Sequence, residues 1–385
     1  MDELQFFIPS RIYLGQNSLS RVGSVAEKYG VRALLVSDSS LLEMDLRERL
    51  AEILGRKGIR LILAQGVDTT ATGDFIEEIL SLARASRTEM IISLGGIRTL
   101  SVAKAASALY NWESSVDDLL DGELPDLKQI PKLPYIEIPT TCRNPFMLNN
   151  QFLILDGRNM RNRIMEVTGS IPDAVIMEPQ LGASLSQKYT LSTLLDSFLY
   201  ALEGYLSLKN NFFSDSLFLK SLSLLDSALE ILDNPEYTDD FLNKTFQAGL
   251  CASVGLSMSR LGVGAALAFA LGGRFELPKS LVAAMMIPTM LEYGALAAPD
   301  KMARVAVILE PDTRKLPPSA AAVKAVEIMR IRLGKHIGEL RIPNLKIPSD
   351  EMTDLAEFIH TYPMIRDLPG ALSSKDIRDM IRRTF

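Results

Sequence analysis

Three polar side chains recur at helical spacing within the apolar stretch LLDSFLYALEGYLS, residues 194–207. Tyr200 follows Asp196 by four residues and Glu203 follows Tyr200 by three, so on a helix the three side chains share one face. If that face is buried, the carboxylate of Asp196 needs a partner, because an unpaired buried charge is costly. The first question that the sequence raises is therefore which group Asp196 holds.

The first half of the chain alternates short apolar runs with helical patterns. Five runs predict strands, at residues 32–38, 60–66, 90–96, 135–141 and 173–179. Helical apolar spacing precedes each of the first three, at residues 18–30, 46–58 and 73–86. Alternation of this kind predicts a mostly parallel sheet covered by helices, and ligands of such sheets bind at the carboxyl ends of the strands.

The second half, from about residue 183, shows no strand signal. It predicts long amphipathic helices at residues 186–208, 213–233, 239–257, 280–296, 318–336, 349–361 and 374–384. Segments rich in Pro and Gly separate them. The chain therefore divides near residues 178–180 into an α/β domain, residues 1–179, and an all-α domain, residues 180–385.

Composition limits the function classes. Of 385 residues, 47% are apolar and 23% are charged, as in soluble globular proteins, and a net charge of −6 with scattered basic residues argues against a nucleic-acid partner. The longest uncharged apolar stretches, Leu261–Gly273 and Leu281–Leu291, are shorter than the about 20 residues that span a bilayer. The acidic start does not resemble a secretory signal. We therefore expect a cytoplasmic protein without a membrane segment.

Cysteine and histidine are too few for several kinds of site. Cys142 and Cys251 are predicted to be free thiols in a reducing compartment, and Cys142 is expected to be buried and inert rather than reactive. The two histidines, His336 and His360, are expected at the surface or at helix ends. Their number and their place in the last sixth of the chain exclude a histidine-based metal site or triad elsewhere in the sequence.

The segment IISLGGIRTLSVAKAAS, residues 91–107, combines an apolar strand, a glycine pair and the start of a helix. Gly95 and Gly96 let backbone N–H groups approach a phosphate at the helix N-terminus, where the helix dipole favours an anion. A plain tight turn explains the same two glycines equally well, so both interpretations stay open.

Several segments follow one another in an order and at spacings that are typical of one family. They are Asp38 after the first predicted strand, the loop from Gly95–Gly96 to Lys104, IPTT (138–141), IPDAVIMEP (171–179), LLDSFLYALEGYLS, AFALGGRFELPKSLVAAMMIPTMLEY and the C-terminal SSKDIRDMIRRTF. Over nearly its whole length the chain resembles the iron-containing alcohol dehydrogenases, which have a dehydroquinate-synthase-like fold. The resemblance implies a nucleotide-binding α/β domain, a helical domain, NAD or NADP as cofactor and a homo-oligomer. It also implies a small alcohol or aldehyde as a ligand in the cleft between the domains.

The metal site of that family uses one Asp and three His, and the resemblance places these ligands residue by residue. The Asp falls on Asp196, and the three His fall on Tyr200, Ala265 and Lys279. A further family His, which lies near the substrate, falls on Phe269. Because catalytic metals normally keep three protein ligands, the resemblance predicts that no iron or zinc of the family type binds here.

The first nucleotide loop departs from the family pattern. Gly95 and Gly96 match, but Ile97 stands where the family has a third Gly, and a β-branched residue is poorly suited to close backbone approach or an unusual φ. Asp38 lies where NAD-preferring members hold the adenosine ribose, although Asp at the end of a strand is also an ordinary helix cap. The guanidinium of Arg98 offers a new contact to phosphate.

The second loop, with the family pattern Thr-Thr-Ala-Gly-Thr-Gly-Ser-Glu, corresponds to residues 140–147. Thr140 and Thr141 match and are candidate cofactor contacts. Arg143 and Pro145 replace two glycines, which stiffens the loop and fills space, and Arg143 adds a second candidate contact to phosphate.

Lys279 suggests what Asp196 holds. Because Lys279 falls at the position of a metal ligand, its ammonium would occupy the place of the cation and pair with Asp196, with Tyr200 hydrogen-bonded to either. On this interpretation the chain keeps the family's scaffold without its metal chemistry.

Two other interpretations stay open. A positive charge beside a phenol favours the phenolate, so a Tyr200–Lys279 pair could exchange a proton with a substrate hydroxyl while a nicotinamide takes the hydride. Alternatively, the chain is a non-catalytic protein that binds a ligand or a partner subunit, with its cleft filled by Phe146, Met147, Phe269 and the loop arginines, Arg98 and Arg143.

Overall fold

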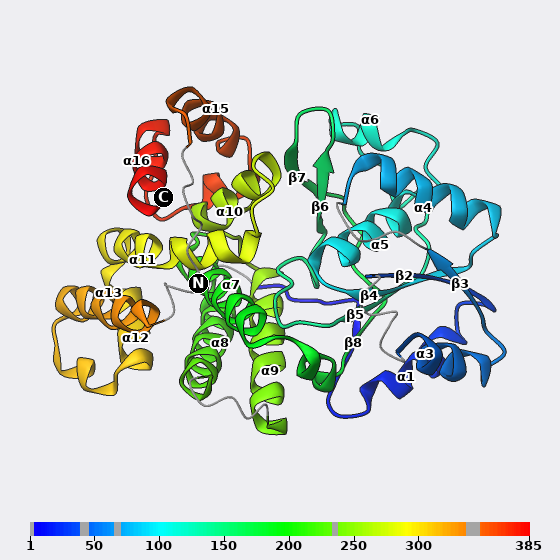
Figure 1. Ribbon diagram of the computed structural model, residues 1–385, viewed down its shortest axis with the longest axis horizontal. Helices are drawn as coiled ribbons and strands as arrows, with labels where there is room; N and C mark the ends of the chain where they lie inside the picture. The colour runs from blue at the N-terminus through cyan, green and yellow to red at the C-terminus, as the bar shows by residue number, and fades with distance from the viewer. Residues whose placement is uncertain (1–3, 39–45, 65–70, 233–237, 336–346) are drawn as a thin grey trace. The chain divides into compact units, whose positions relative to one another are not determined.

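The structure, a computed structural model, describes residues 4–38, 46–64, 71–232, 238–335 and 347–385 (Figure 1). The chain forms two compact units, Met1–Ala183 and Ser184–Phe385. The division lies four residues beyond residue 179, the predicted end of the α/β domain. All described strands belong to the first unit, and the second unit is helical throughout its described residues.

The first unit is built around a six-stranded sheet in which all neighbouring strands are parallel. The strands are β1 (Arg11–Leu14), β2 (Arg32–Ser37), β3 (Arg60–Ala64), β4 (Met90–Gly95), β5 (Tyr135–Pro139) and β8 (Ala174–Met177). Their order across the sheet is β1-β8-β5-β4-β2-β3. The predicted parallel sheet is confirmed, while the edge strand β1 is one that the patterns above do not predict. Residues 65 and 66, at the end of the predicted strand 60–66, lie outside the described residues.

Helices cover both faces of this sheet (Figure 1). They are η1 (Ser18–Ser20), α1 (Arg21–Ala26), α3 (Leu46–Gly55), α4 (Gly73–Ala85), α5 (Ile97–Leu109), α6 (Val116–Leu120) and η2 (Pro179–Ser184). Successive strand residues point to opposite faces, so along β2 Ala33 and Leu35 join the core with α1 and α3. Leu34 and Val36 join the other core, with α4, α5 and α6. The two-sided burial explains why β2 is apolar at every one of these positions.

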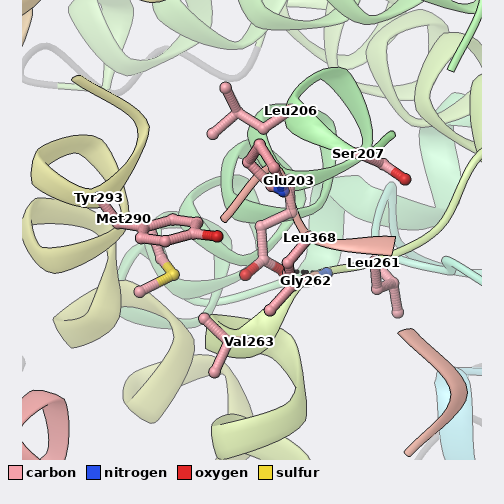
Figure 2. Close-up of a pocket in the computed structure, with 10 residues that line it drawn as sticks. Glu203, Leu206, Ser207, Leu261, Gly262, Val263, Met290, Tyr293 and Leu368 are labelled. Carbon is pink, nitrogen blue, oxygen red and sulfur yellow. Dashed lines mark hydrogen bonds between the residues drawn. The ribbon is translucent and has the colours of Figure 1, made fainter. Parts of the chain in front are cut away.

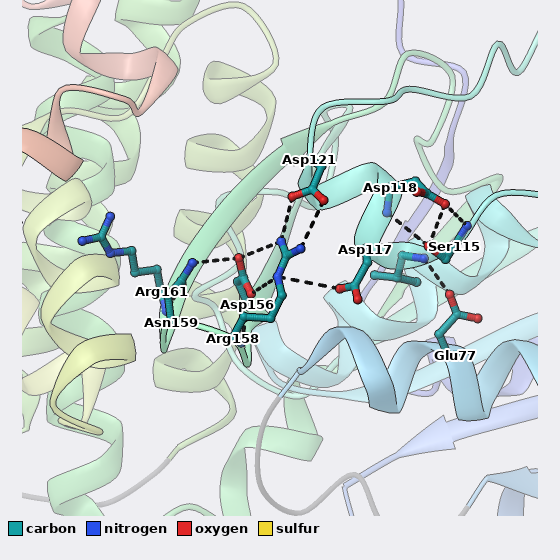
Figure 3. A network of polar contacts seen from close by, with 10 residues as sticks. Glu77, Ser115, Asp117, Asp118, Asp121, Asp156, Arg158, Asn159 and Arg161 are labelled. Carbon is teal, nitrogen blue, oxygen red and sulfur yellow. Dashed lines mark hydrogen bonds and ion pairs between the residues drawn. The ribbon is translucent and has the colours of Figure 1, made fainter.

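An antiparallel hairpin of β6 (Gln151–Asp156) and β7 (Arg161–Glu166) is a further element that the patterns above do not predict. Its sequence signal is the Asp-Gly pair at the turn, flanked by apolar residues, which is typical of hairpins. Arg158 in the turn pairs with Asp156 at 2.9 Å and with Asp121, the C-cap of α6, at 3.0 Å (Figure 3). The hairpin turn is thereby fastened to that helix.

The second unit consists of helices that match the predicted ones closely. They are α7 (Gln187–Leu206), α8 (Phe212–Ile231), α9 (Asp239–Leu256), α10 (Val263–Arg274), α11 (Lys279–Ala297), α12 (Pro299–Leu309), η3 (Pro311–Lys315), α13 (Pro318–Gly334), α15 (Ser349–Ile359), η4 (Pro363–Asp367) and α16 (Ser374–Thr384). The patterns miss α10 and α12. Almost all of α10 is buried and it has no polar face, so it lacks the amphipathic period. The start of α12 is marked by Pro299 at its first turn.

Helix α11 is the one helix among the described residues with the length and apolar composition of a membrane span. Half of that window is buried inside the protein. It packs against α7, α10 and α13, as a core helix of the unit does.

Candidate functional site

The first candidate site lies where the strand order of the sheet reverses. From β2 the chain goes to β3 at one edge and then returns to the other side of β2 to form β4. In such sheets ligands bind at the reversal point, outside the carboxyl ends of the two strands. Here those ends are Asp38, which follows β2, and Gly95, which ends β4. The topology alone thus brings Asp38, at the end of β2, close to the loop at Gly95–Gly96.

Hydrogen bonds of Asp38 connect the end of β2 to the loop at Gly95–Gly96. The Asp38 carboxylate accepts a hydrogen bond from the Thr99 hydroxyl and one from the Gly96 N–H at 3.3 Å. A Cβ on Gly95 would lie 2.8 Å from Asp38 Oδ2 and 2.9 Å from Thr99, so no larger residue fits there. The role of Asp38 toward a ribose stays a prediction, and the structure gives this side chain a second role in shaping the loop.

The N-terminus of α5 is open on the side of Gly96. Gly96 is the N-cap and makes no side-chain capping bond, and a Cβ added there would meet no atom within 4 Å. Ile97, at the position of the family's third glycine, is the first residue of α5 and is buried, so its conformation needs no glycine. Arg98 is exposed in the first turn. The glycine pair therefore forms the start of a helix that can accept an anion, which favours the phosphate interpretation over a plain turn.

The loop of residues 140–147 lies directly beside the loop at Gly95–Gly96. The Thr140 N–H donates to the Gly95 carbonyl at 3.1 Å. Thr140 and Thr141 are buried, and so is Cys142, as predicted, whereas Arg143 is half-buried. The structure thus brings the predicted cofactor residues of both loops to one end of the sheet, and these residues could hold a dinucleotide.

The second candidate site lies within the helical unit, where α7 passes the start of α11. Lys279 is the first residue of α11, and its Nζ lies 2.7 Å from Asp196 Oδ2 and 3.0 Å from Asp196 Oδ1. Asp196 is fully buried, and the Lys279 side chain is 11% exposed. The predicted ion pair is confirmed, so Asp196 holds an ammonium.

Two aromatic rings complete the surroundings of this ammonium. Lys279 Nζ lies 4.3 Å from the ring centroid of Tyr200 and 4.7 Å from that of Phe269. Such cation–π contacts partly replace the hydration that the buried ammonium has lost. The predicted hydrogen bond of Tyr200 to Asp196 or Lys279 is wrong, because the lysine lies over the face of the ring. Among the described residues, the buried Tyr200 hydroxyl has no hydrogen-bond partner.

These residues do not fit a metal of the family type. Asp196 is the single carboxylate among the positions that the resemblance assigns, and an ammonium 2.7 Å away would repel a bound cation. Ala265 lies fully buried in α10 and offers no ligand atom in its side chain. Over the described parts of the chain, no group of three or more His, Cys, Asp or Glu could hold a metal ion.

Glu203 is a residue whose role the sequence reasoning misses. Its buried carboxylate accepts hydrogen bonds from the backbone N–H groups of Gly262 (3.0 Å), Gly264 (2.6 Å) and Ala265 (3.1 Å), at the N-terminus of α10. Burial raises the pKa of Glu203 to about 7, against the lowering effect of these bonds. A Cβ on Gly262 would lie 2.7 Å from the carboxylate, so the Gly-x-Gly before an apolar run is the signal that could have revealed the cap.

The pocket beside Glu203 is too small for a substrate. Figure 2 shows Met290 and Tyr293 facing Glu203 across it. Its volume is about 10 Å³, which holds about one water molecule. Glu203 therefore acts as a structural cap of α10 rather than as a catalytic acid.

His360 is the exposed C-cap of α15, as predicted, and His336 lies outside the described residues.

Comparison with known proteins agrees with this architecture. Residues 9–179 match the family model "Iron-containing alcohol dehydrogenase", and residues 190–385 match "Fe-containing alcohol dehydrogenase family, C-terminal". The chain belongs to the iron-containing alcohol dehydrogenase family. The resemblance inferred from the motifs is confirmed, and with it the predicted class of oxidoreductases that act on small alcohols.

Members of this family span the chain at low identity. The probable alcohol dehydrogenase EutG of Escherichia coli (strain K12) is 25% identical over 340 residues, which are 87% of this chain and 84% of that protein. A 1,3-propanediol oxidoreductase structure is 20% identical, with a TM-score of 0.90 over 100% of both chains. Sulfoacetaldehyde reductase from Bifidobacterium kashiwanohense, solved in complex with NAD+, is 17% identical, with a TM-score of 0.83 over 100% of this chain and 99% of that one. These structures confirm the fold.

Proposed function

We propose that this protein is an NAD(P)-binding member of the iron-containing alcohol dehydrogenase family in which a lysine–aspartate ion pair takes the place of the metal. The observation that carries the proposal is the contact of Lys279 Nζ with both carboxylate oxygens of Asp196, at 2.7 and 3.0 Å. The ammonium supplies the positive charge beside the buried Asp196, so the site needs no cation. Alcohol oxidation that depends on iron or zinc is then absent.

Dinucleotide binding is supported by the first unit. The open N-terminus of α5 and the adjoining loops offer backbone donors, Arg98 and Thr140 at one end of the sheet. The related sulfoacetaldehyde reductase was solved with NAD+. We infer that NAD or NADP binds with its phosphates at the N-terminus of α5.

The test adds NADH, NADPH, Fe²⁺ and Zn²⁺ separately to the purified protein. Unfolding temperature and calorimetric binding are measured, because a ligand that binds the native state raises the unfolding temperature. We expect a shift with at least one dinucleotide and none with either metal. Stoichiometric metal in the purified protein, or a metal-induced shift that Asp196→Asn abolishes, would refute the replacement of the metal.

A second candidate function is metal-independent hydride transfer. Two features of Tyr200 favour it. The buried hydroxyl has no hydrogen-bond partner among the described residues, and the ring contacts the Lys279 ammonium. A nicotinamide hydride would attack the carbonyl carbon of an aldehyde, and Tyr200 would donate its proton to the oxygen, giving the alcohol and NAD(P)+; solvent would then reprotonate Tyr200. Consumption of NADH or NADPH with small aldehydes tests this. Tyr200→Phe should abolish the reaction and Tyr205→Phe should not.

We also infer a homo-oligomer that binds a small-molecule ligand in the cytoplasm, as the family resemblance suggests. Light scattering after gel filtration gives the mass of the particle, and a mass of one chain over the working concentration range would rule out the oligomer.

A further inference from the structure

A fully buried lysine lies in the middle of α5. Lys104 is 2% exposed, and every residue of this helix except Arg98 is buried. Its Nζ donates hydrogen bonds to the carbonyl oxygens of Phe146 and Asn149, both at 2.6 Å. The lysine thereby joins α5 to the far end of the loop that follows β5.

The same loop is held from β5 as well. The Glu137 carboxylate on that strand accepts hydrogen bonds from Asn144 Nδ2 at 2.6 Å and from the Tyr135 hydroxyl at 3.1 Å. Asn144 Oδ1 in turn accepts from the Phe146 N–H at 3.1 Å. Glu137 is buried, so this part of the loop rests on polar contacts inside the protein.

Burial disfavours the charged forms of both Lys104 and Glu137. Burial lowers the pKa of Lys104 to about 7, and burial raises the pKa of Glu137 to about 7, while each group opposes the shift of the other. Placing both groups inside the protein is unfavourable unless their hydrogen bonds are satisfied. Here the loop carbonyls and the Asn144 amide satisfy them.

The place of Lys104 connects this network to the dinucleotide site. The N-terminus of its helix is the candidate phosphate site, and the loop it holds begins at Thr140, whose N–H bonds to Gly95. A shift of the loop relative to α5 would therefore change the spacing between the two sides of that site.

We propose that Lys104 is a positioning residue of the dinucleotide site, which fixes the loop of residues 140–149 against α5 through the carbonyls of Phe146 and Asn149. This inference rests on the proposed binding of NAD or NADP. Lys104 itself does not touch the dinucleotide, because it is enclosed by the protein.

The test compares Lys104→Met with a matched control, Lys301→Met. Lys301 lies in the helical unit, where its Nζ likewise donates to a backbone carbonyl, that of Tyr205 at 2.7 Å. For each protein we would measure the dissociation constant for NADH and NADPH, the unfolding temperature, and amide hydrogen exchange of residues 140–150. We expect Lys104→Met to weaken binding tenfold or more and to speed exchange in that segment. Lys301→Met should lower the unfolding temperature and leave both other quantities unchanged.

The outcomes separate this inference from the proposed function. If the wild-type protein binds neither dinucleotide, the proposed function fails. If it binds one, and folded Lys104→Met binds it within twofold of wild type, the positioning role is overturned. Should Lys104→Met not fold, Lys104→Met with Glu137→Gln removes both buried ionisable groups, and the same comparison is made with that variant.

Discussion

The helical unit contains two groups of Lys, Asp and Tyr that look alike. In one, Lys279 pairs with Asp196 at 2.7 Å and lies 4.3 Å from the Tyr200 ring centroid. In the other, Lys301 pairs with Asp215 at 3.1 Å and lies 4.5 Å from the ring centroid of Tyr205.

The two groups differ in burial and in further partners. Asp196 is fully buried, whereas the Asp215 side chain is 18% exposed. Lys301 also donates to a backbone carbonyl, and burial lowers its pKa. Because the arrangement occurs twice, a lysine that lies over a tyrosine ring and pairs with an aspartate does not by itself indicate a catalytic site. What sets the Lys279 group apart is its deeper burial and its place at positions that the resemblance assigns to the family's metal ligands.

The largest effect is expected for Asp196→Asn. The change leaves the Lys279 ammonium buried without its counter-charge, which should lower the free energy of unfolding by about 3–5 kcal/mol. Urea unfolding followed by circular dichroism measures it. A loss no greater than that of Asp215→Asn would mean that the two groups are equivalent after all.

Glu203→Gln should have the next largest effect. The variant replaces one of the two oxygens that accept three backbone N–H bonds at the start of α10 with an NH2 group, which cannot accept, and leaving such donors unsatisfied costs about 1–3 kcal/mol. Glu357→Gln, at an exposed position of α15, offers a control that makes the same chemical change without touching the cap. An unchanged unfolding midpoint for Glu203→Gln would contradict the capping role.

Glu203 also predicts a pH dependence. Its pKa in the folded protein is raised to about 7 from an ordinary value near 4.5, so the folded state binds the proton more tightly than the unfolded state. The associated stability is complete below about pH 4.5 and is lost as the pH rises through 7. We expect urea midpoints of the wild type to fall from pH 5 to pH 8 more steeply than those of Glu203→Gln. Equal slopes would argue against a raised pKa.

A smaller effect is expected for Asp215→Asn. Because this pair is partly exposed, solvent screens it, and its removal should cost about 0.5–1 kcal/mol. The same urea titration that serves Asp196→Asn measures it. A cost as large as that of Asp196→Asn would show that burial does not separate the two groups.

The smallest effect is expected when both charges of the Lys279 group are removed together. Asp196→Leu with Lys279→Met leaves no unpaired buried charge, and such replacements are often neutral, so the stability should stay within about 1 kcal/mol of the wild type. A double variant as unstable as Asp196→Asn would show that the pair contributes more than mutual neutralisation. Dinucleotide binding, which belongs to the first unit, should be unchanged.

Much of the fold could be predicted because it depends on periodic patterns. The five predicted strands and the amphipathic helices follow from alternation and from helical spacing, which buried faces impose on the sequence. Helix α10 has no such face, since it is surrounded by protein, and its pattern is therefore uniform. The hairpin of β6 and β7 has its clearest signal in the turn, Asp156-Gly157, which a pattern of strand–helix alternation does not include.

The site was predictable only in part. The Lys279–Asp196 pair could be predicted by comparing this sequence with the family's ligand positions. A lysine at one of those positions brings a positive charge, which can neutralise the carboxylate of Asp196. The orientation of Tyr200 did not follow, since a lysine can approach either the hydroxyl or the ring. The partners of Lys104 and Glu203 are backbone atoms, which every residue has, and no side-chain pattern identifies them.

The ion pair at Lys279 also has an evolutionary consequence. Building a three-histidine site of the family type would require changes at Tyr200, Ala265 and Lys279 together, because a catalytic metal needs about three protein ligands. Replacing Lys279 first would leave Asp196 as a lone buried anion, and installing the other histidines first would leave them facing an ammonium. Each single step toward the family's ligand set is thus expected to lower the stability of the folded protein, so, under the proposed function, the ion pair opposes the gain of a metal site one residue at a time.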